Sequence, residues 1–279
     1  MLLALTFCKV AKCMMDNPRF IDTHCHFDFP PFSDALSDSL EKAAEGGITD
    51  IIIPTVSADN FQRVWSLSLD YPQLYAAMGF HPLYLSQFQE VHFEMLVDFL
   101  ARKSKKCISI GEIGLDLYMQ DPQFERQQIL LQRQLKLAKQ FDLPIILHSR
   151  KSHDQLAAML RRHDVPARGV VHGFAGSLSQ AENFVKLGYY IGVGGTITYE
   201  RANKTRQVMA QLPLSCLVFE TDAPDMPVSG FQGEPNRPER IQWVFQSLCE
   251  LRHESADEIA QQLYNNSRTL FNLNQTEMR

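Results

Sequence analysis

The chain has 279 residues, of which 45% are hydrophobic, and a formal net charge of −5 at pH 7. This charge argues against a protein that coats duplex DNA, which would carry a broad basic face, but a nuclease needs only a local basic patch. No apolar run reaches the length of a membrane span, so the sequence predicts no membrane association.

The N-terminal sequence and the cysteines allow predictions about domain organisation and cellular location. We expect residues 1–18 to be a poorly ordered extension, because their apolar start lacks the basic residue and the cleavage site of a signal peptide. Residues 19–279 are predicted to form a single domain. The six cysteines are scattered without a C-x-x-C pair, which predicts free thiols and a cytoplasmic location.

Short apolar runs alternate with longer amphipathic segments along this domain. We predict strands at 19–24, 49–54, 74–79, 107–112, 144–148, 169–172, 189–193 and 216–221. We predict helices at about 35–46, 58–69, 90–103, 123–141, 153–163, 178–187, 202–211, 237–252 and 256–271. Capping signals support three helix starts: Asp121-Pro122, Ser177-x-x-Gln180 and Ser255-x-x-Glu258.

Eight strands that are each followed by a helix predict an α/β fold of the (β/α)₈ barrel type. The alternative is an open doubly wound sheet, which usually has fewer strands and a glycine-rich first turn. Here the first turn, 23–26, has no glycine. The glycine-rich run at 192–195 lacks the G-x-G-x-x-G spacing of a dinucleotide site.

Histidines and carboxylates follow five of the predicted strands, where barrel enzymes place their functional residues. Their nitrogen and oxygen atoms suit hard or borderline divalent cations. The six candidate metal ligands are His24, His26, Glu112, His148, His172 and Asp222.

The first two ligands lie two residues apart on one strand, so His24 and His26 point to the same face and can chelate one metal. Glu112 continues the apolar row of Ile108 and Ile110. A buried carboxylate is costly unless it is paired or metal-bound, so we expect Glu112 to bridge two cations.

His148 and His172 each end a run of aliphatic residues. One such histidine is more often a hydrogen-bonded core residue, but two on successive strands indicate a second metal. Asp222 ends the eighth strand, where it could bind a metal and accept a proton from water whose pKa a metal lowers to about 7. Glu220 shares its face; it could orient a ligand or form a buried structural ion pair.

His81 ends the third strand and is predicted to contact the substrate or to protonate a leaving group. With Asp222 and Glu112 it completes our set of catalytic candidates. Asp116 could support the loop after the fourth strand. The other histidines that fall in helical stretches are expected at the surface: His92, His153, His163 and His253.

Cations stand where two predicted helices begin, although helix N-termini favour negative charge. Arg150 and Lys151 precede the helix after strand five, and Arg201, Lys204 and Arg206 begin the one after strand seven. A phosphate held at those helix ends would explain this placement, whereas ordinary solvated charge is the alternative. We therefore predict that Arg150, Arg201 and Lys204 bind the substrate.

With these residues identified, the chain resembles the TatD family of metal-dependent hydrolases (TatD-related DNases), and within it the bacterial YjjV group. The resemblance covers about 19–272, and its motifs are highly specific as a set. The matching segments are Phe20-Ile-Asp-Thr-His-Cys-His26, Gly79-Phe-His-Pro82, Gly111-Glu-Ile-Gly-Leu-Asp116, Leu147-His-Ser-Arg150, Val171-His-Gly-Phe174 and Glu220-Thr-Asp-Ala-Pro224.

The resemblance implies a TIM-like barrel of the amidohydrolase-like type, one to three divalent metals, and nuclease activity on DNA in several members. It places one metal between His24, His26, Glu112 and Asp222. It places a second between Glu112, His148 and His172.

These observations predict an enzyme with two divalent metal ions that hydrolyses phosphodiester bonds of DNA or another phosphate-containing substrate, without an obligate protein partner. The histidines suit zinc, while the carboxylates also admit manganese or magnesium. One alternative is a hydrolase of a small amide, ester or lactone that uses the same metals. Another is a non-catalytic binding module that the metals merely stabilise.

Overall fold

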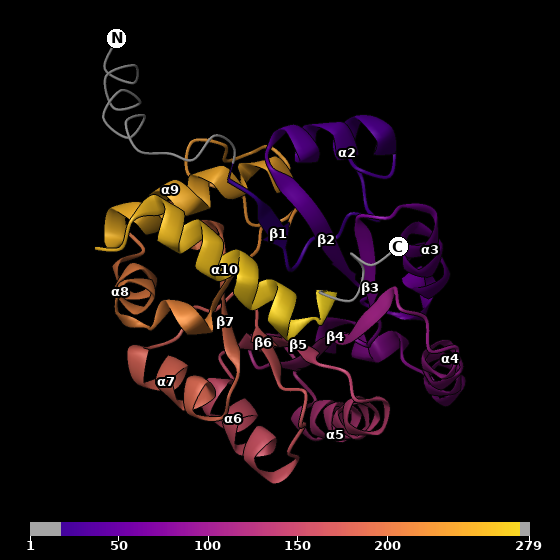
Figure 1. Cartoon of the computed structure of the whole chain (residues 1–279). Coiled ribbons are helices and arrows are strands. Elements are labelled where there is room, and N and C mark those ends of the chain that lie inside the picture. The colour runs from indigo at the N-terminus through magenta and orange to yellow at the C-terminus, as the bar shows by residue number, and fades with distance from the viewer. Residues whose placement is uncertain (1–17, 274–279) are drawn as a thin grey trace.

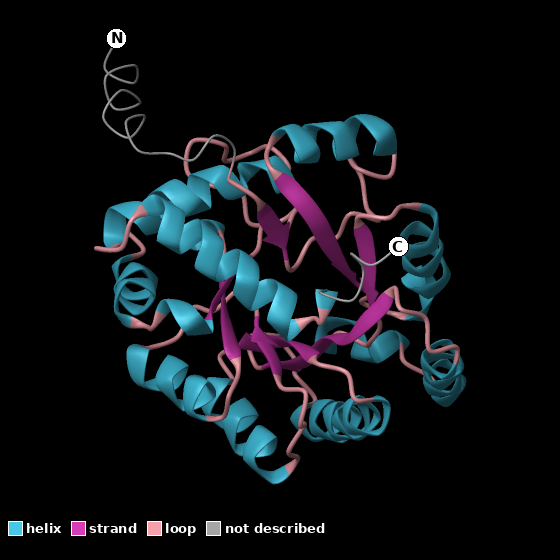
Figure 2. Cartoon of the chain, viewed as in Figure 1, coloured by secondary structure: helices cyan, strands magenta, loops and turns pink. Residues whose placement is uncertain are grey.

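A computed structural model of the chain describes residues 18–273. Within them, eight parallel strands follow one another in sequence order around a barrel, and helices surround it (Figures 1 and 2). The strands are β1 (Phe20–Asp22), β2 (Ile48–Pro54), β3 (Leu74–Ala77), β4 (Cys107–Asp116), β5 (Ile145–Arg150), β6 (Gly169–Val171), β7 (Tyr190–Val193) and β8 (Leu217–Phe219). The helices are α2 (Leu36–Glu45), α3 (Ala58–Asp70), α4 (Glu90–Ala101), α5 (Phe124–Phe141), α6 (His153–Arg162), α7 (Leu178–Lys186), α8 (Asn203–Gln211), α9 (Ile241–Leu251) and α10 (Ala256–Leu270).

The barrel is closed between its first and last strands. The Thr23 N–H donates to the Phe219 carbonyl at 3.0 Å, and the Asp222 N–H donates to the His24 carbonyl at 2.8 Å. The buried Asp22 carboxylate accepts two further hydrogen bonds from Thr221. The backbone N–H of Thr221 donates to Oδ1 at 3.0 Å, and its hydroxyl donates to Oδ2 at 2.5 Å. These contacts hold the β1 and β8 ends together, which places His24 beside Asp222.

The interior of the barrel is filled by one apolar cluster that draws on all eight strands. Its strand members are Ile21, Ile52, Tyr75, Ala77, Ile108, Ile146, Val170, Tyr190 and Val218. Tyr264 and Leu270 of α10 join this cluster, and Figure 1 shows α10 lying across one end of the barrel. The bottom of the barrel is therefore covered by an apolar helix face, and the polar groups of the candidate site gather at the other end.

The predicted barrel is confirmed, and the open sheet is wrong. β4 is longer than predicted because its pairing with β5 continues to the Asp116–Arg150 pair. The capping boxes at Ser177 and Ser255 are confirmed, whereas α5 begins at Phe124 after a left-handed Gln123 rather than at Asp121-Pro122.

Other sequence expectations meet the structure only in part. The predicted extension lies outside the described residues, apart from residue 18. Four of the six cysteines fall in the described part and are free thiols there, as predicted: Cys25, Cys107, Cys216 and Cys249. Of the helices in residues 18–273, none is both long and apolar enough to cross a membrane.

Candidate metal centre

The six predicted metal ligands converge at the carboxyl-terminal mouth of the barrel, around the buried carboxylate of Glu112. Glu112 Oε2 faces β1, 3.2 Å from His24 Nε2 and 3.8 Å from His26 Nε2. Glu112 Oε1 faces the opposite side, 2.9 Å from His148 Nδ1 and 2.7 Å from His172 Nε2. One carboxylate thus presents one oxygen to each half of the ligand set, which is the arrangement expected of a bridging ligand.

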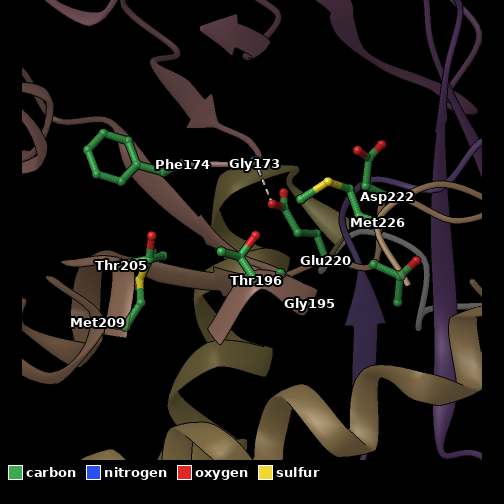
Figure 3. A pocket seen from close by; sticks show the side chains of 11 residues that line it. Gly173, Phe174, Gly195, Thr196, Thr205, Met209, Glu220, Asp222 and Met226 are labelled. Atoms are coloured by element: carbon green, nitrogen blue, oxygen red, sulfur yellow. Dashed lines mark hydrogen bonds between the residues drawn. The ribbon is translucent and has the colours of Figure 1, made fainter. Parts of the chain in front are cut away.

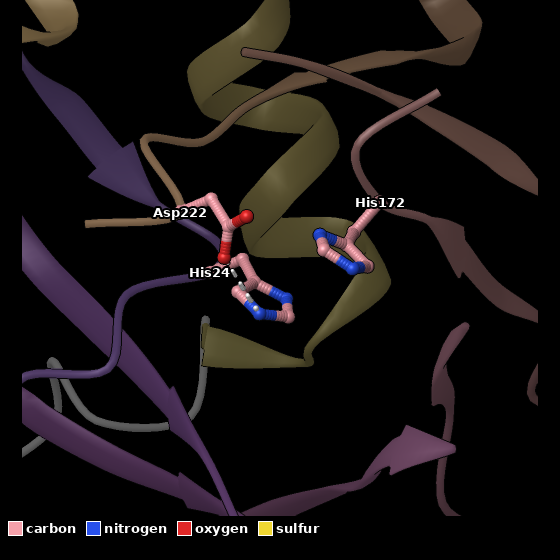
Figure 4. A group of neighbouring side chains, drawn as sticks. All are labelled: His24, His172 and Asp222. Atoms are coloured by element: carbon pink, nitrogen blue, oxygen red, sulfur yellow. Dashed lines mark ion pairs between the residues drawn. The ribbon is translucent and has the colours of Figure 1, made fainter. Parts of the chain in front are cut away.

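Asp222 completes the β1 side. Its Oδ1 lies 3.4 Å from His24 Nε2 and 3.7 Å from His26 Nε2. Figure 4 shows Asp222 beside His24, with the ring of His172 close by. The backbone of Asp222 is left-handed, with φ of 56°, a strained conformation for a residue with a side chain. The turn after β8 holds this strain, and it points the carboxylate into the site.

Among residues 18–273, three groups of three side chains bring their ligand atoms within 4.8 Å of one another, and they differ from the two sets that the family resemblance implies. They are His24–His172–Asp222, His24–His26–Glu112 and His81–Glu112–His148. His172 can join either side because its ring stacks on that of His24. The two Glu112 oxygens divide the site differently, because His24 and His26 lie beside Oε2 whereas His148 and His172 lie beside Oε1.

The electrostatics of the cluster fit divalent cations. Burial alone would raise the pKa of Glu112, but His172, His81 and His24 hold it well below its usual value. Burial alone would lower the pKa of His172, but the neighbouring carboxylates of Glu112, Asp222 and Glu220 raise it to about 10. The buried carboxylates therefore require positive charge between them, and a divalent cation supplies more of it than a proton on one imidazole.

His81 lies next to the cluster with a fixed tautomer. The Leu83 backbone N–H donates to its Nδ1 at 3.0 Å, so the ring proton resides on Nε2, which lies 3.0 Å from Glu112 Oε1. A nitrogen that carries a proton cannot bind a metal. His81 is therefore a hydrogen-bond donor that faces the site, although its position alone would also suit a ligand.

Asp116 does more than the loop support that the sequence suggested. It is buried at the end of β4, and its Oδ2 lies 3.0 Å from His148 Nε2. An acceptor at Nε2 holds a ring proton there and leaves Nδ1 free to face Glu112 and a metal. The sequence could have indicated this role, because side chains alternate between the two faces of a strand and Asp116 therefore lies on the same face of β4 as Glu112.

A cleft opens over the cluster, and the predicted substrate-binding cations lie at different distances from it. Arg150 and Lys151 line the cleft itself, and both lie over the exposed ring of Tyr118, at 4.1 and 4.2 Å from its centroid. Arg201 lines a neighbouring hollow with Tyr199, and the two hollows share Met226. Lys204 lies on the exposed surface of α8, and Arg206 donates to the Ile197 carbonyl at 2.6 Å.

His153 was expected at the surface, and this expectation is wrong. The residue is 8% exposed, lines the cleft, and packs edge-on against Phe174 with ring centroids 4.9 Å apart. As the first residue of α6 it turns toward α7 rather than outward. A helical stretch alone does not tell which face of the helix a residue occupies.

Glu220 lies one layer beneath the cluster, buried beside a small chamber that the glycine-rich run 192–195 helps to form. Its Oε1 accepts a hydrogen bond from the Gly173 N–H at 2.6 Å, drawn as a dashed line in Figure 3. A Cβ on Gly192 would lie 2.3 Å from Glu220 Oε2. The glycines thus make room for a carboxylate, and this carboxylate fixes the backbone directly after His172.

A parallel barrel with four histidines and two carboxylates converging at its mouth defines the class of metal-dependent hydrolases with an amidohydrolase-like fold. The chain belongs to the TatD family, because the family model described as "TatD related DNase" matches residues 21–272.

Relatives of this family match almost the whole chain. The uncharacterized metal-dependent hydrolase YjjV of Escherichia coli K12 is 62% identical over 91% of this chain and 98% of its own length. Its crystal structure, over the same shares, superposes with a TM-score of 0.90. An uncharacterized metal-dependent hydrolase of Haemophilus influenzae is 44% identical over 91% of this chain and 99% of its own. The phosphotriesterase homology protein of E. coli, 16% identical with a TM-score of 0.67 over 92% of this chain and 99% of its own, shares the fold.

Proposed function

We propose that this hydrolase cleaves phosphodiester bonds of DNA, with two divalent ions on the two sides of Glu112. The observation that carries the proposal is the pairing of a two-sided carboxylate with the cations Arg150 and Lys151 in the same cleft. Carboxylate-bridged metal pairs occur in many nucleases and phosphatases, and cations beside such a pair suit a phosphate.

His24, His26, Glu112 and Asp222 would hold one ion, and Glu112, His148 and His172 the other. Ions in these places would polarise the phosphoryl oxygens and lower the pKa of water. Zinc, manganese and magnesium all suit this mixed set of imidazole and carboxylate ligands. Elemental analysis of freshly purified protein identifies the native metal and its stoichiometry.

Side chains of the protein would supply the general base, a hydrogen-bond donor and the contacts to the substrate. Burial raises the pKa of Asp222, which suits a carboxylate that accepts a proton from the attacking water. His81 would donate a hydrogen bond from Nε2 to the negative charge that develops on a phosphoryl or leaving oxygen. Arg150 would hold a phosphate in the cleft, and Arg201 could contact a more distant part of a longer substrate.

The test is an activity screen of metal-loaded protein on single-stranded DNA, duplex DNA and a small phosphodiester, with magnesium, manganese, zinc and cobalt in turn. An Asp222→Asn protein prepared in parallel controls for contaminating nucleases. We expect cleavage that depends on the metal and is lost in the variant. Intact DNA and intact diester with every metal would overturn the proposal.

A second candidate, a hydrolase of a small ester, amide or lactone, is favoured by one observation. Leu83 and Met226 are 46% and 41% exposed and line the same cleft, so an apolar substrate group could pack there. Neutral lactone, ester and amide substrates in the same screen distinguish the two candidates. For the location of the protein we propose the cytoplasm, with support from the free thiols of the described cysteines.

A further inference from the structure

Helix α5 directs two buried glutamines toward the candidate metal centre. Gln127 and Gln134 are each 1% exposed. They lie seven residues apart, about two helical turns, and therefore on one face of the helix. Burying a primary amide is unfavourable unless its donors and acceptor are bonded, so each glutamine requires partners on the barrel side.

Each glutamine forms a two-point contact with the backbone of one residue, and Gln127 Nε2 also donates to the Pro122 carbonyl at 2.5 Å. Gln127 Oε1 accepts from the Asp116 N–H at 2.8 Å, and its Nε2 donates to the Asp116 carbonyl at 2.9 Å. Gln134 Oε1 accepts from the Phe80 N–H at 2.7 Å, and its Nε2 donates to the Phe80 carbonyl at 3.3 Å. In a β-sheet, a neighbouring strand forms hydrogen bonds with both the N–H and the carbonyl of a residue. The two glutamine side chains therefore provide the bonds that a neighbouring strand would give to the backbone after β3 and at the end of β4.

The backbone held by Gln127 belongs to the residue that orients His148. The carboxylate of Asp116 is fixed twice, since its Oδ1 accepts from the Tyr118 N–H at 2.8 Å while its Oδ2 contacts His148 Nε2 at 3.0 Å. If the backbone of Asp116 moves, its carboxylate leaves Nε2. The ring proton of His148 is then free to shift to Nδ1, the atom that faces Glu112.

The backbone held by Gln134 leads into His81. Phe80 directly precedes His81, whose own N–H donates to the Val56 carbonyl at 3.0 Å. The hydrogen bond from the Leu83 N–H to His81 Nδ1 depends on the conformation of residues 80–83, because both partners lie in this segment. Loss of the contact at Phe80 would therefore weaken the bond that keeps the His81 ring proton on Nε2.

We propose that Gln127 and Gln134 are positioning residues, which set the ring orientation and tautomer of His148 and His81 through the backbones of Asp116 and Phe80. This inference deepens the proposed function and rests on its metal centre. Its readout is the state of two imidazole rings, which can be measured whether or not the protein cleaves DNA.

The experiment compares the full-length protein with Gln127→Met and Gln134→Met, which keep side-chain length and remove the hydrogen bonds. Gln128→Met is the matched control, since Gln128 is the neighbour of Gln127 and lines a surface hollow between α5 and α6. Long-range proton–nitrogen spectra of protein with nitrogen-15-labelled histidine report which ring nitrogen carries the proton, with and without zinc. Calorimetry reports zinc affinity, and thermal melting reports stability.

We expect the two variants to act on different rings. Gln127→Met should weaken zinc binding about 10–100-fold, as changes behind metal-bound histidines do, and should change the ring signals of His148 more than those of His81. Gln134→Met should change the signals of His81 more than those of His148. Gln128→Met should change neither ring.

A purely structural role would lower the melting temperature and leave both rings and the zinc affinity of the folded protein as in the wild type, and that outcome overturns the proposal. Equal disturbance of both rings by either variant overturns it as well. If Gln127→Met does not fold, Gln127→Glu keeps an acceptor for the Asp116 N–H and replaces the amide donor with a carboxylate oxygen that faces the Asp116 carbonyl. It should change the His148 signals in the same direction, and unchanged signals would again reject the inference.

Discussion

The imidazole ring of His24 stacks on that of His172, with centroids 3.8 Å apart and an angle of 12° between the planes. Two buried rings this close cannot both carry a positive charge. Burial first, and then His172, lowers the pKa of His24 well below its usual value, while the carboxylates around His172 raise the pKa of that ring to about 10. The first and sixth strand ends therefore share one centre of positive charge, the place where a cation is proposed to bind.

Metal removal should lower the stability of the protein. Without cations, the buried carboxylates of Glu112 and Asp222 depend on protonated histidines for positive charge. A ligand at 100 times its dissociation constant stabilises the folded state by about 2.7 kcal/mol per site. For a chain of this size we expect chelation to lower the melting temperature by about 5–10 °C for each site that loses its metal, measured by calorimetry with and without added metal. Glu112→Gln, which loses the bridging carboxylate, should melt at the same temperature in both conditions; a metal-dependent gain that survives in this variant would contradict a bridging role.

Asp222→Asn should lower kcat at least 100-fold, because loss of a general base typically costs about 10²–10⁴ in rate. The amide has nearly the shape of the carboxylate, so the left-handed turn after β8 should persist. Circular dichroism and melting of the metal-free protein check the fold. Activity near the wild-type level in a folded variant would show that Asp222 is not the general base.

Arg150→Ala should harm only anionic substrates. A charge-assisted hydrogen bond contributes about 1.5–3 kcal/mol, so kcat/KM on a phosphodiester should fall about 10–100-fold. The value for a neutral ester should stay within about twofold. Tyr118→Ala removes the ring that both cations contact and should have a smaller effect in the same direction, since an exposed cation–π contact contributes about 0.5–1 kcal/mol. Tyr118→Phe keeps the ring and serves as its control; equal losses on neutral and anionic substrates in Arg150→Ala would rule out a phosphate contact.

The sequence predicted the barrel because each strand and helix carries its own local signal. Apolar runs such as 144–148 and capping boxes such as Ser255-x-x-Glu258 act over a few residues, and their order along the chain then defines the topology. The end of β4 escaped prediction because it depends on pairing with β5. The start of α5 was predicted to within one residue, but the expected cap at Asp121-Pro122 does not form, because Gln123 takes a left-handed conformation.

The candidate ligands were predictable for a similar reason, since a polar residue that ends an apolar run stands out locally. The residues behind them were not. Gln127 looks like any glutamine of an amphipathic helix until the backbone of Asp116 lies against it. His153 looked exposed because the helix period alone does not fix which side packs on α7. Such roles depend on contacts between residues far apart in the chain.

The buried His153 should make stability depend on pH. Burial lowers the pKa of His153 from its usual 6.5 to about 4, so the unfolded chain binds more protons than the folded one between these values. The stabilising contribution is present above about pH 6.5 and is lost as the pH falls toward 4. Between pH 7 and pH 5 we expect the free energy of unfolding to fall by about 1–2 kcal/mol more in the wild type than in His153→Gln. Denaturant titrations at both pH values measure this difference, and His163→Gln, at the other end of α6, controls for the loss of any histidine. Equal pH dependence in wild type and His153→Gln would contradict the prediction.

Gly114→Ala should disturb the His148 side of the centre. Gly114 has φ of 152°, and a Cβ there would lie 2.0 Å from the His148 carbonyl oxygen, with two further backbone atoms of His148 within 2.9 Å. Since these atoms belong to the paired strand β5, the strand must move away to admit the methyl group. Overpacking of this kind typically costs about 1–3 kcal/mol, and the shift also moves the imidazole away from Glu112.

Gly230→Ala is the matched control: Gly230 also has positive φ, of 93°, but its Cβ would meet nothing within 4 Å. We therefore expect both variants to lose stability through backbone strain, and only Gly114→Ala to lose zinc affinity as well. Calorimetric titration of the two folded proteins measures this, and an unchanged affinity in Gly114→Ala would show that the position of His148 does not depend on the close approach of β4 and β5.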